Sequence, residues 1–217
     1  MLLVAAVVSG GYLYYIKEVR VIPEELVASS LENTLAVGNY RYQVSASLEL
    51  DGTDKRALSD INGEKQKNNF HIKGTMLGQQ VEVYQVDDIT YSLNPKTQQW
   101  MVTPGSELFQ PELFMTEINP MSNFRFTQVN NIQYQGVEKN NHQKLHIITC
   151  NPVVNNGFLE KYWQDFSYRL WIDRHSERVV KAQISAVSLR DPKDTMRIEV
   201  DLKDFNKKFT IKPPESD

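Results

Sequence analysis

From residue 39 onwards, apolar and polar residues alternate along most of the chain, as they do in strands that bury one face. The clearest case is residues 40–50, where Tyr, Val, Ala and Leu alternate with Arg, Gln, Ser and Glu until Asp51-Gly52 ends the run. The same pattern predicts ten further strands, at residues 56–66, 69–74, 80–86, 89–94, 98–103, 125–137, 143–150, 168–173, 178–189 and 195–205. Most connections are too short for crossover helices, so we expect an antiparallel meander.

Three segments interrupt the alternation and predict helices. Residues 23–37 place their apolar side chains on one stripe, with Pro23 in the first turn and Gly38 after the last. Residues 106–115 are typical of a helix broken by a proline, and residues 155–166 form a second helical insert rich in aromatic residues. Because so long a sheet must curl or pack, we expect a mainly β (α+β) fold. It would be a single curved antiparallel sheet or half-barrel of about eleven strands, with helices covering its concave face.

The first sixteen residues, MLLVAAVVSGGYLYYI, carry no charge. As a helix they would span about 24 Å, short of a hydrocarbon core of about 30 Å, with tyrosines gathered at the downstream end as at a membrane interface. Three interpretations are open. We favour an uncleaved N-terminal membrane-spanning helix with a few upstream residues missing. A cleaved signal peptide lacks a clear basic region and cleavage site, and the third interpretation is a buried core helix.

The chain therefore divides into residues 1–20, a transmembrane anchor or signal-like segment, and residues 21–217, a single half-barrel domain. Lys17 and Arg20 follow the apolar run and mildly oppose export under the positive-inside rule, although a missing N-terminal flank would change that count.

Composition excludes several classes of function. The chain has 217 residues, with 24 Lys and Arg against 27 Asp and Glu, so it lacks the basic excess of a nucleic-acid-binding protein. Its single cysteine, Cys150, excludes an internal disulfide and a cysteine-based metal cluster. Cys150 also lies far beyond the apolar run, so it is not the lipidated cysteine of a lipoprotein anchor.

No motif for catalysis or for a cofactor is present. The glycine-rich nucleotide-binding motifs, G-x-S-x-G and H-E-x-x-H are all absent. His142 and His146 would lie on one strand face about 13 Å apart, too far for one metal ion. We expect His71 and His175 to be exposed, and Cys150 has no adjacent base in the sequence. These observations predict a protein that is not an enzyme and that needs no metal and no cofactor.

Large apolar side chains concentrate around the two helical inserts. Met and aromatic residues on such inserts can form an adaptable apolar surface for a flexible ligand, although they can equally be lids that pack an ordinary core. The candidates for lining a ligand cavity are Trp100, Phe109, Phe114, Met115, Phe158, Tyr162, Trp163 and Trp171.

Three stretches resemble a known group of proteins. Residues 40–52 are similar to the opening strand and turn of extracytoplasmic lipoprotein carriers. Residues 83–100, VYQVDDITYSLNPKTQQW, resemble their hairpin with a displayed residue pair, a proline turn and a tryptophan. Residues 168–173 (YRLWID), leading to 178–182 (RVVKA), resemble their late hairpin. Over residues 23–212 the chain thus resembles the LolA/LolB-like superfamily, which includes LppX/LprG-type lipoproteins and the N-terminal domain of RseB-type regulators.

This resemblance implies an eleven-stranded, half-open sheet whose concave side is plugged by helices and binds acyl chains, without a cofactor or catalysis. The chain departs from the carriers because it lacks the lipidated cysteine and has the N-terminal apolar run. We therefore expect a single-pass plasma-membrane protein whose extracytoplasmic domain binds lipid or lipoprotein acyl chains, as carrier or sensor. The main alternative is an envelope protein–protein interaction or signalling module that uses the same sheet without bound lipid. An enzyme acting on lipid is a third possibility with little support.

Overall fold

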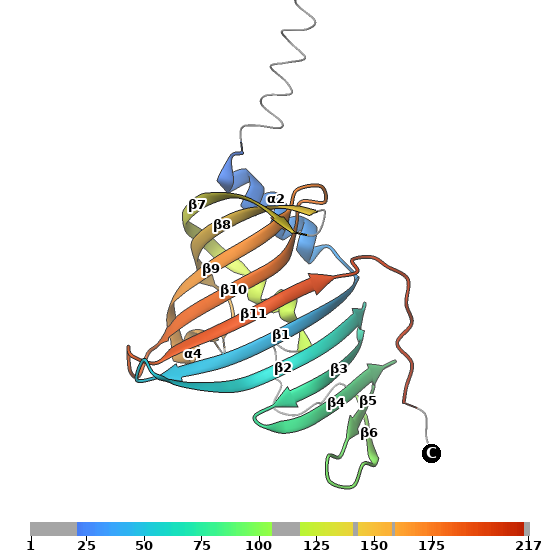
Figure 1. Cartoon of the computed structure of the whole chain (residues 1–217). Coiled ribbons are helices and arrows are strands. Elements are labelled where there is room, and N and C mark those ends of the chain that lie inside the picture. The colour runs from blue at the N-terminus through green and yellow to red at the C-terminus, as the bar shows by residue number, and fades with distance from the viewer. Residues whose placement is uncertain (1–20, 106–117, 141–142, 158, 215–217) are drawn as a thin grey trace, which may run out of the picture.

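The computed structural model describes residues 21–105, 118–140, 143–157 and 159–214. They form one antiparallel sheet of eleven strands in the order β6-β5-β4-β3-β2-β1-β11-β10-β9-β8-β7 (Figure 1). The strands are β1 (Asn39–Leu50), β2 (Asp54–Gln66), β3 (Asn69–Met76), β4 (Gln79–Val86), β5 (Ile89–Leu93), β6 (Trp100–Pro104), β7 (Phe126–Asn140), β8 (Gln143–Val154), β9 (Trp163–Asp173), β10 (Arg178–Ser188) and β11 (Thr195–Lys203). The predicted strand number and antiparallel pairing are confirmed.

The strand order places the first and last strands together at the centre of the sheet. β1 pairs with β11 over nine residues, from Arg41 opposite Lys203 to Glu49 opposite Thr195. Two meanders extend outwards from this pair and end at β6 and β7, which are consecutive in the chain but lie at opposite edges. The connection between them must therefore run from one edge to the other.

The described part of this connection packs on the concave face. It contains η2 (Pro120–Phe124), a short 3-10 helix whose five residues are all buried. The hydroxyl of Tyr168 in β9 donates a hydrogen bond to the carbonyl of Asn123 at 3.0 Å. The hydroxyl of Tyr42 in β1 donates to the carbonyl of Ile118 at 3.1 Å. Two tyrosines of the sheet thus hold residues 118–124 of the connection against the concave face.

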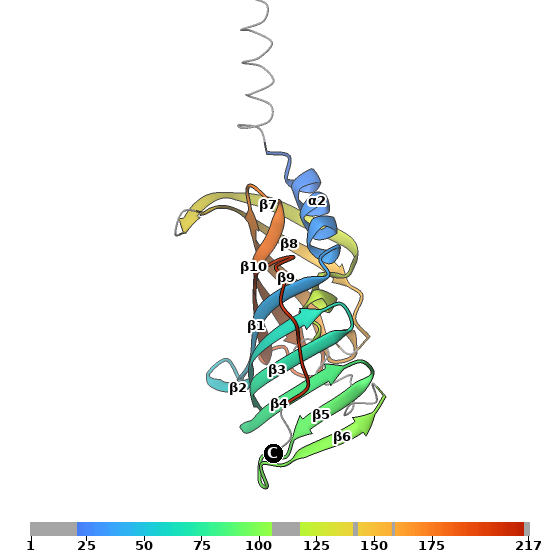
Figure 2. The same ribbon diagram turned by 90° about the vertical axis from the view of Figure 1, so that its right-hand side faces the viewer.

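The N-terminal helix, α2 (Pro23–Leu35), lies on the concave side at the β7–β10 end of the sheet, and the β5–β6 hairpin lies at the other end (Figure 2). It ends two residues earlier than predicted, and its buried positions are Val27, Ser30 and Thr34. The Thr34 hydroxyl donates to the Ser30 carbonyl at 2.6 Å and accepts from the Val179 amide of β10 at 2.9 Å. The small side chains of Ser30 and Thr34 allow the helix to approach the sheet closely, and both buried hydroxyl groups form hydrogen bonds.

The core follows the strand alternation. Residues facing the helices form one large cluster, and its largest fully buried side chains are Tyr40, Tyr42, Tyr168, Phe124, Ile61, Ile72, Ile148, Leu159, Leu170, Ile172, Ile184 and Ile198. The opposite face carries a separate small cluster of Leu145, Ile147 and Trp171. One face of the sheet therefore contains nearly all of the apolar packing, as expected for a single layer covered on one side.

The helix predicted over residues 155–166 is wrong for most of its length. β8 continues to Val154, α4 covers only Leu159–Tyr162, and β9 already begins at Trp163. Trp163 lies opposite Ser188, and the pairing of β9 with β10 shifts register between Ser185 and Val187. This irregularity breaks the two-residue period, and Asp165 has a positive φ of 53°. The alternation of apolar and polar residues therefore does not indicate the first residues of β9. Aromatic residues also favour strands more than helices.

Two further predictions lie outside the described residues: the broken helix at 106–115 and the N-terminal membrane-spanning helix. Among the helices of the described ranges, none has the length and apolarity needed to cross a bilayer.

Candidate functional site

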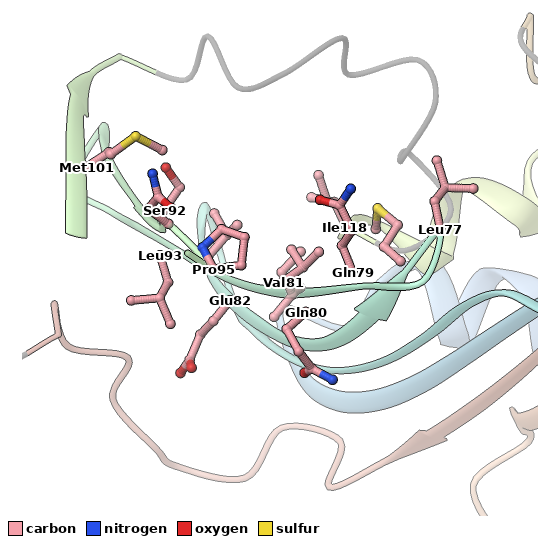
Figure 3. A pocket seen from close by; sticks show the side chains of 14 residues that line it. Leu77, Gln79, Gln80, Val81, Glu82, Ser92, Leu93, Pro95, Met101 and Ile118 are labelled. Carbon is pink, nitrogen blue, oxygen red and sulfur yellow. The ribbon is translucent and has the colours of Figure 1, made fainter. Parts of the chain in front are cut away.

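A pocket of about 330 Å³ opens on the concave face at the β3–β6 end of the sheet (Figure 3). Its floor is formed by side chains of β3, β4, β5 and β6, and Ile118 forms part of its wall. The main apolar lining residues are Ile72, Met76, Leu77, Val81, Val83, Pro95, Met101 and Ile118. Its volume lies at the lower end of the range of about 300–1,000 Å³ that is typical of small-molecule sites.

Strand register explains which side chains face this pocket. A row of directly opposed residues crosses four strands: Ile72 pairs with Val83, Val83 with Ser92, and Ser92 with Met101. Side chains in such a row lie on the same face of the sheet. In Figure 3, Met101 and Ser92 point to one side of the strands, whereas Leu93 and Glu82 point to the other.

Gly74 allows β3 to approach β2 closely beside the pocket. It lies between Ile61 and Val81 in the next row. A Cβ atom at Gly74 would collide with the backbone carbonyl oxygen of Asp60 in β2. Glycine is therefore required here for the close approach of the two strands.

The wall at Ile118 depends on a second glycine. Gly63 lies directly beneath the ring of Tyr42, so a Cβ atom at that position would overlap the ring. With glycine there, the Tyr42 ring lies flat against β2 and its hydroxyl reaches the Ile118 carbonyl. Gly63 and Tyr42, both near the centre of the sheet, thus determine the position of Ile118 in the pocket wall.

The outer face of the same strands is polar and closely packed. His71 stacks on Tyr84 with ring centroids 3.9 Å apart, and Tyr84 in turn contacts the edge of Trp100. Glu82 accepts hydrogen bonds from His71 at 3.2 Å and from Lys73 at 2.9 Å. The prediction that His71 is exposed is wrong, because only 20% of its side chain is accessible between these partners. His175 is exposed, as predicted.

This outer cluster shifts two pKa values. Burial raises the pKa of Glu82, but the hydrogen bonds and charges of Lys73 and His71 outweigh burial and leave that pKa below its usual value. Burial, together with the nearby Glu82 carboxylate, raises the pKa of Tyr84 to about 12. Both shifts favour an ionised Glu82 beside a protonated Tyr84, which is the arrangement expected of a structural hydrogen-bond network. Within the described ranges, no group of three or more His, Cys, Asp or Glu side chains is arranged to hold a metal ion.

Neither Cys150 nor His146 has the surroundings of a catalytic group. Cys150 is 2% exposed, and burial raises the pKa of its thiol to about 11. It is therefore protonated at neutral pH and a poor nucleophile. His146 is also buried, with Nδ1 3.0 Å from the Tyr134 hydroxyl, and burial lowers the pKa of its ring.

Four of the eight residues predicted to line a cavity are described by the structure, and they lie at separate places. Trp100 lies on the outer face against Tyr84, and Trp171 belongs to the small outer cluster, where its indole donates to Glu138 at 3.2 Å. Trp163 packs at the border of the main core, and Tyr162 is half-buried at the end of α4. Phe109, Phe114, Met115 and Phe158 lie outside the described residues.

None of these four described residues lines the pocket of β3–β6. Trp100 is larger than its neighbour Met101, but adjacent strand residues point to opposite faces, and Met101 is the one on the pocket side. The signal that identifies the floor is the alignment of apolar alternate positions in β3, β4 and β6. That alignment depends on how neighbouring strands pair, and the pairing register of β3–β6 cannot be read from the sequence of one strand.

Comparison with known proteins finds this architecture in solved structures. No family model matches the chain, and no curated protein matches its sequence. The solved structure of LprF from Mycobacterium bovis is similar, with a TM-score of 0.61 and 13% identity over 89% of this chain and 97% of that one. The lipoprotein LppX from Mycobacterium tuberculosis has a TM-score of 0.54 and 17% identity over 87% and 99%. A LolA superfamily protein from Nitrosomonas europaea has a TM-score of 0.38 and 10% identity over 88% and 96%.

The chain thus shares the fold of LppX and LprF, the first of which belongs to the group of proteins that the sequence resembles. At these identities the likeness shows the fold alone.

Proposed function

We propose that this protein binds lipid or lipoprotein acyl chains in the pocket formed by β3–β6. The apolar, partly open hollow on the concave face is the observation that carries the proposal. It is supported by the shared fold with LppX, which is described as a lipoprotein, and with LprF. In this proposal the domain is extracytoplasmic, and residues 1–20 hold it at the plasma membrane as a single-pass anchor. It acts as a carrier or sensor without catalysis.

The physical basis is transfer of methylene groups out of water. Each buried methylene contributes about 0.8 kcal/mol, so about ten of them would contribute about 8 kcal/mol before the entropic cost of binding. Binding of this kind needs little polar recognition, and the lining of the floor by aliphatic and methionine side chains fits it. Methionine in particular adapts to irregular chains.

The alternative of an envelope interaction module has one observation in its favour. β7 is a fifteen-residue edge strand with no described strand on its outer side, and Tyr134 and Val137 on it are exposed. Open edges of this kind accept an added strand from a partner. In that case the pocket would be incidental and lipid would not bind.

The test is lipid binding by residues 21–217, a fragment that contains all the described helices and strands. The fragment is purified from a bacterial host, its co-purified lipid is identified by native mass spectrometry, and a fluorescent fatty acid is titrated into it. Met101→Glu places a charge in the pocket, and the matched control Val102→Glu places it on the opposite face of the same strand. Both residues are exposed in the structure (45% and 59%), so neither substitution removes a core side chain.

We expect co-purified lipid, and at least about tenfold weaker fatty-acid binding by Met101→Glu, equivalent to about 1.4 kcal/mol, with Val102→Glu unchanged. Absence of both co-purified lipid and fatty-acid uptake would overturn the proposal. Equal losses in the two variants would place the ligand elsewhere.

A further inference from the structure

A second pocket, of about 390 Å³, lies where the C-terminal end of α2, the turn between β2 and β3, and η2 meet. Its lining includes three cationic side chains, Lys65, Lys67 and Arg125, and two amides, Asn68 and Asn119. It includes no carboxylate. Among the described residues, none of the three cations forms an ion pair. This cationic pocket therefore has an excess of positive charge that the described part of the protein does not neutralise.

Lys65 is placed on the apolar side of the sheet. Its register neighbours are Tyr40 in β1 and Phe70 in β3, which are 2% and 4% exposed, so its side chain starts on the concave face. Its ammonium group lies 5.9 Å from the centre of the Phe70 ring. Burial lowers the pKa of Lys65. Burial of a charged ammonium group lowers the stability of the fold unless an anion pairs with it.

Tyr40 supplies a second unsatisfied group at the same site. It lines the cationic pocket, and its hydroxyl is buried without a hydrogen-bond partner among the described residues. Burial raises the pKa of Tyr40, so the phenol stays protonated and can donate a hydrogen bond. A buried hydroxyl without a partner costs about 1–3 kcal/mol. A ligand with several acceptor oxygens would satisfy it and the lysine together.

The cationic pocket adjoins the pocket formed by β3–β6, which we call the acyl pocket after its proposed ligand. Ile118 lines the acyl pocket, and the next residue, Asn119, lines the cationic pocket. On β3, Phe70 lies beside Lys65 and Ile72 lies in the acyl pocket two residues further on, a spacing of about 7 Å. The two pockets are therefore close neighbours on the concave side, and one amphipathic molecule bound in both must pass the wall at Ile118.

Local charge favours an anion at this position. The C-terminal end of α2 contributes a partial negative charge of about half an elementary charge, which opposes an anion. Three side-chain cations outweigh it. A phosphate group, with several acceptor oxygens and up to two negative charges, matches three cations, two amides and a phenol better than a single carboxylate does.

We propose that the cationic pocket binds a phosphate group, supplied by the headgroup of a lipid whose acyl chain occupies the acyl pocket. This inference rests on the proposed function for the source of the phosphate, since a free phosphate ion has the same chemistry. Lys65 and Arg125 provide the charge, and Tyr40 and the two amides provide neutral donors. The protein would then prefer anionic phospholipids over neutral lipids with the same chain.

The test uses the full chain, kept in solution by a non-ionic amphiphilic polymer, in calorimetric titrations. Three probes are compared: a lysophospholipid with a phosphate monoester headgroup, the monoacylglycerol with the same acyl chain, and inorganic phosphate. The variant is the double substitution Lys65→Gln with Arg125→Gln. The matched control is Arg197→Gln with Lys203→Gln, two exposed cations on the outer side of β11.

We expect the wild-type chain to bind the lysophospholipid at least about tenfold more tightly than the monoacylglycerol. The double variant should lose this preference while it keeps its affinity for the monoacylglycerol, which also shows that it is folded. The control should keep the preference. If inorganic phosphate alone binds as strongly as the headgroup and the variant abolishes that binding, the source is the free ion.

Two other results overturn parts of the account separately. Equal affinity of the wild-type chain for the two lipids would overturn the phosphate inference and leave acyl-chain binding intact. Failure of both lipids to bind would overturn the proposed function. The inorganic phosphate titration then decides whether the cationic pocket stands alone or fails as well.

Discussion

The two ends of the concave face differ in what covers their apolar side chains. At the β7–β10 end, α2 and η2 pack on the sheet, and side chains such as Leu170, Ile172 and Val179 are completely or almost completely buried. At the β3–β6 end, the rows that include Val81 and Met101 line a hollow of about 330 Å³. The strands at both ends alternate in the same way. Among the described residues, the comparison shows that the cover, and not the sheet pattern, separates a filled core from a hollow.

The largest expected difference between the two ends is in the cost of removing a buried side chain. Val179→Ala creates a cavity beneath α2 and should lower the free energy of unfolding by about 2–3 kcal/mol. The matched substitution Val81→Ala enlarges a hollow that already exists and should cost less than about 1 kcal/mol. Urea denaturation followed by circular dichroism measures both. Equal costs would mean that the acyl pocket is as tightly packed as the core.

The close approach of β3 to β2 beside the pocket should be sensitive to Gly74. Gly74→Ala forces a Cβ atom against the Asp60 carbonyl and should destabilise the protein by about 1–3 kcal/mol. Gly38→Ala is the control, because open space surrounds that position. Thermal melts of both variants give the comparison. A neutral Gly74→Ala would show that the strands can separate there, and that glycine is not needed for their approach.

A smaller effect is expected when the wall at Ile118 loses its hydrogen bond. Tyr42→Phe and Tyr168→Phe each remove one tyrosine hydrogen bond to the connection, and each should cost about 1 kcal/mol. Only Tyr42→Phe should weaken fatty-acid binding, because Ile118 lines the pocket and Asn123 does not. Fluorescent titration beside urea denaturation separates the two effects. Weaker fatty-acid binding by both variants would mean that residues 118–124 respond as one unit to the loss of either hydrogen bond.

The smallest predicted effect lies on the outer face and depends on pH. The pKa of Glu82 in the folded protein is below its usual value of 4.5, so its ion pairs stabilise the fold above that pH. This stabilisation is lost as the pH falls below 4.5 through the lowered pKa. Glu82→Gln should therefore cost less than about 1 kcal/mol at neutral pH, and the difference from wild type should vanish in acid. A constant difference down to acidic pH would contradict this assignment.

Much of the fold follows from the sequence because strand alternation is a local property. The eleven strands, their antiparallel pairing and α2 can be predicted from runs such as residues 40–50 and from the turn residues between them. The start of β9 cannot, since the bulge near Asp165 and the register shift against β10 disrupt the period. A local pattern search has no access to either feature.

The site is harder to predict than the fold, because a pocket depends on which rows of residues align and on what covers them. Trp100 and Trp171 are large, but they are on the outer face, and their size gives no information about which face they occupy. Met101 and Val81 are ordinary strand residues until register aligns them with Ile72 and Gly74. The cationic pocket combines residues from three distant segments for the same reason.

The most direct test of the central claim is to locate a bound acyl chain by photocrosslinking. A fatty acid with a diazirine on its chain is added to the protein, activated by light, and its attachment sites are mapped by mass spectrometry. If the pocket of β3–β6 binds acyl chains, the label attaches within β3, β4 and β6, at residues such as Val81 and Met101, and unlabelled lipid suppresses the attachment. Attachment confined to the β7–β10 end or to the outer face, or attachment that unlabelled lipid does not suppress, would contradict it.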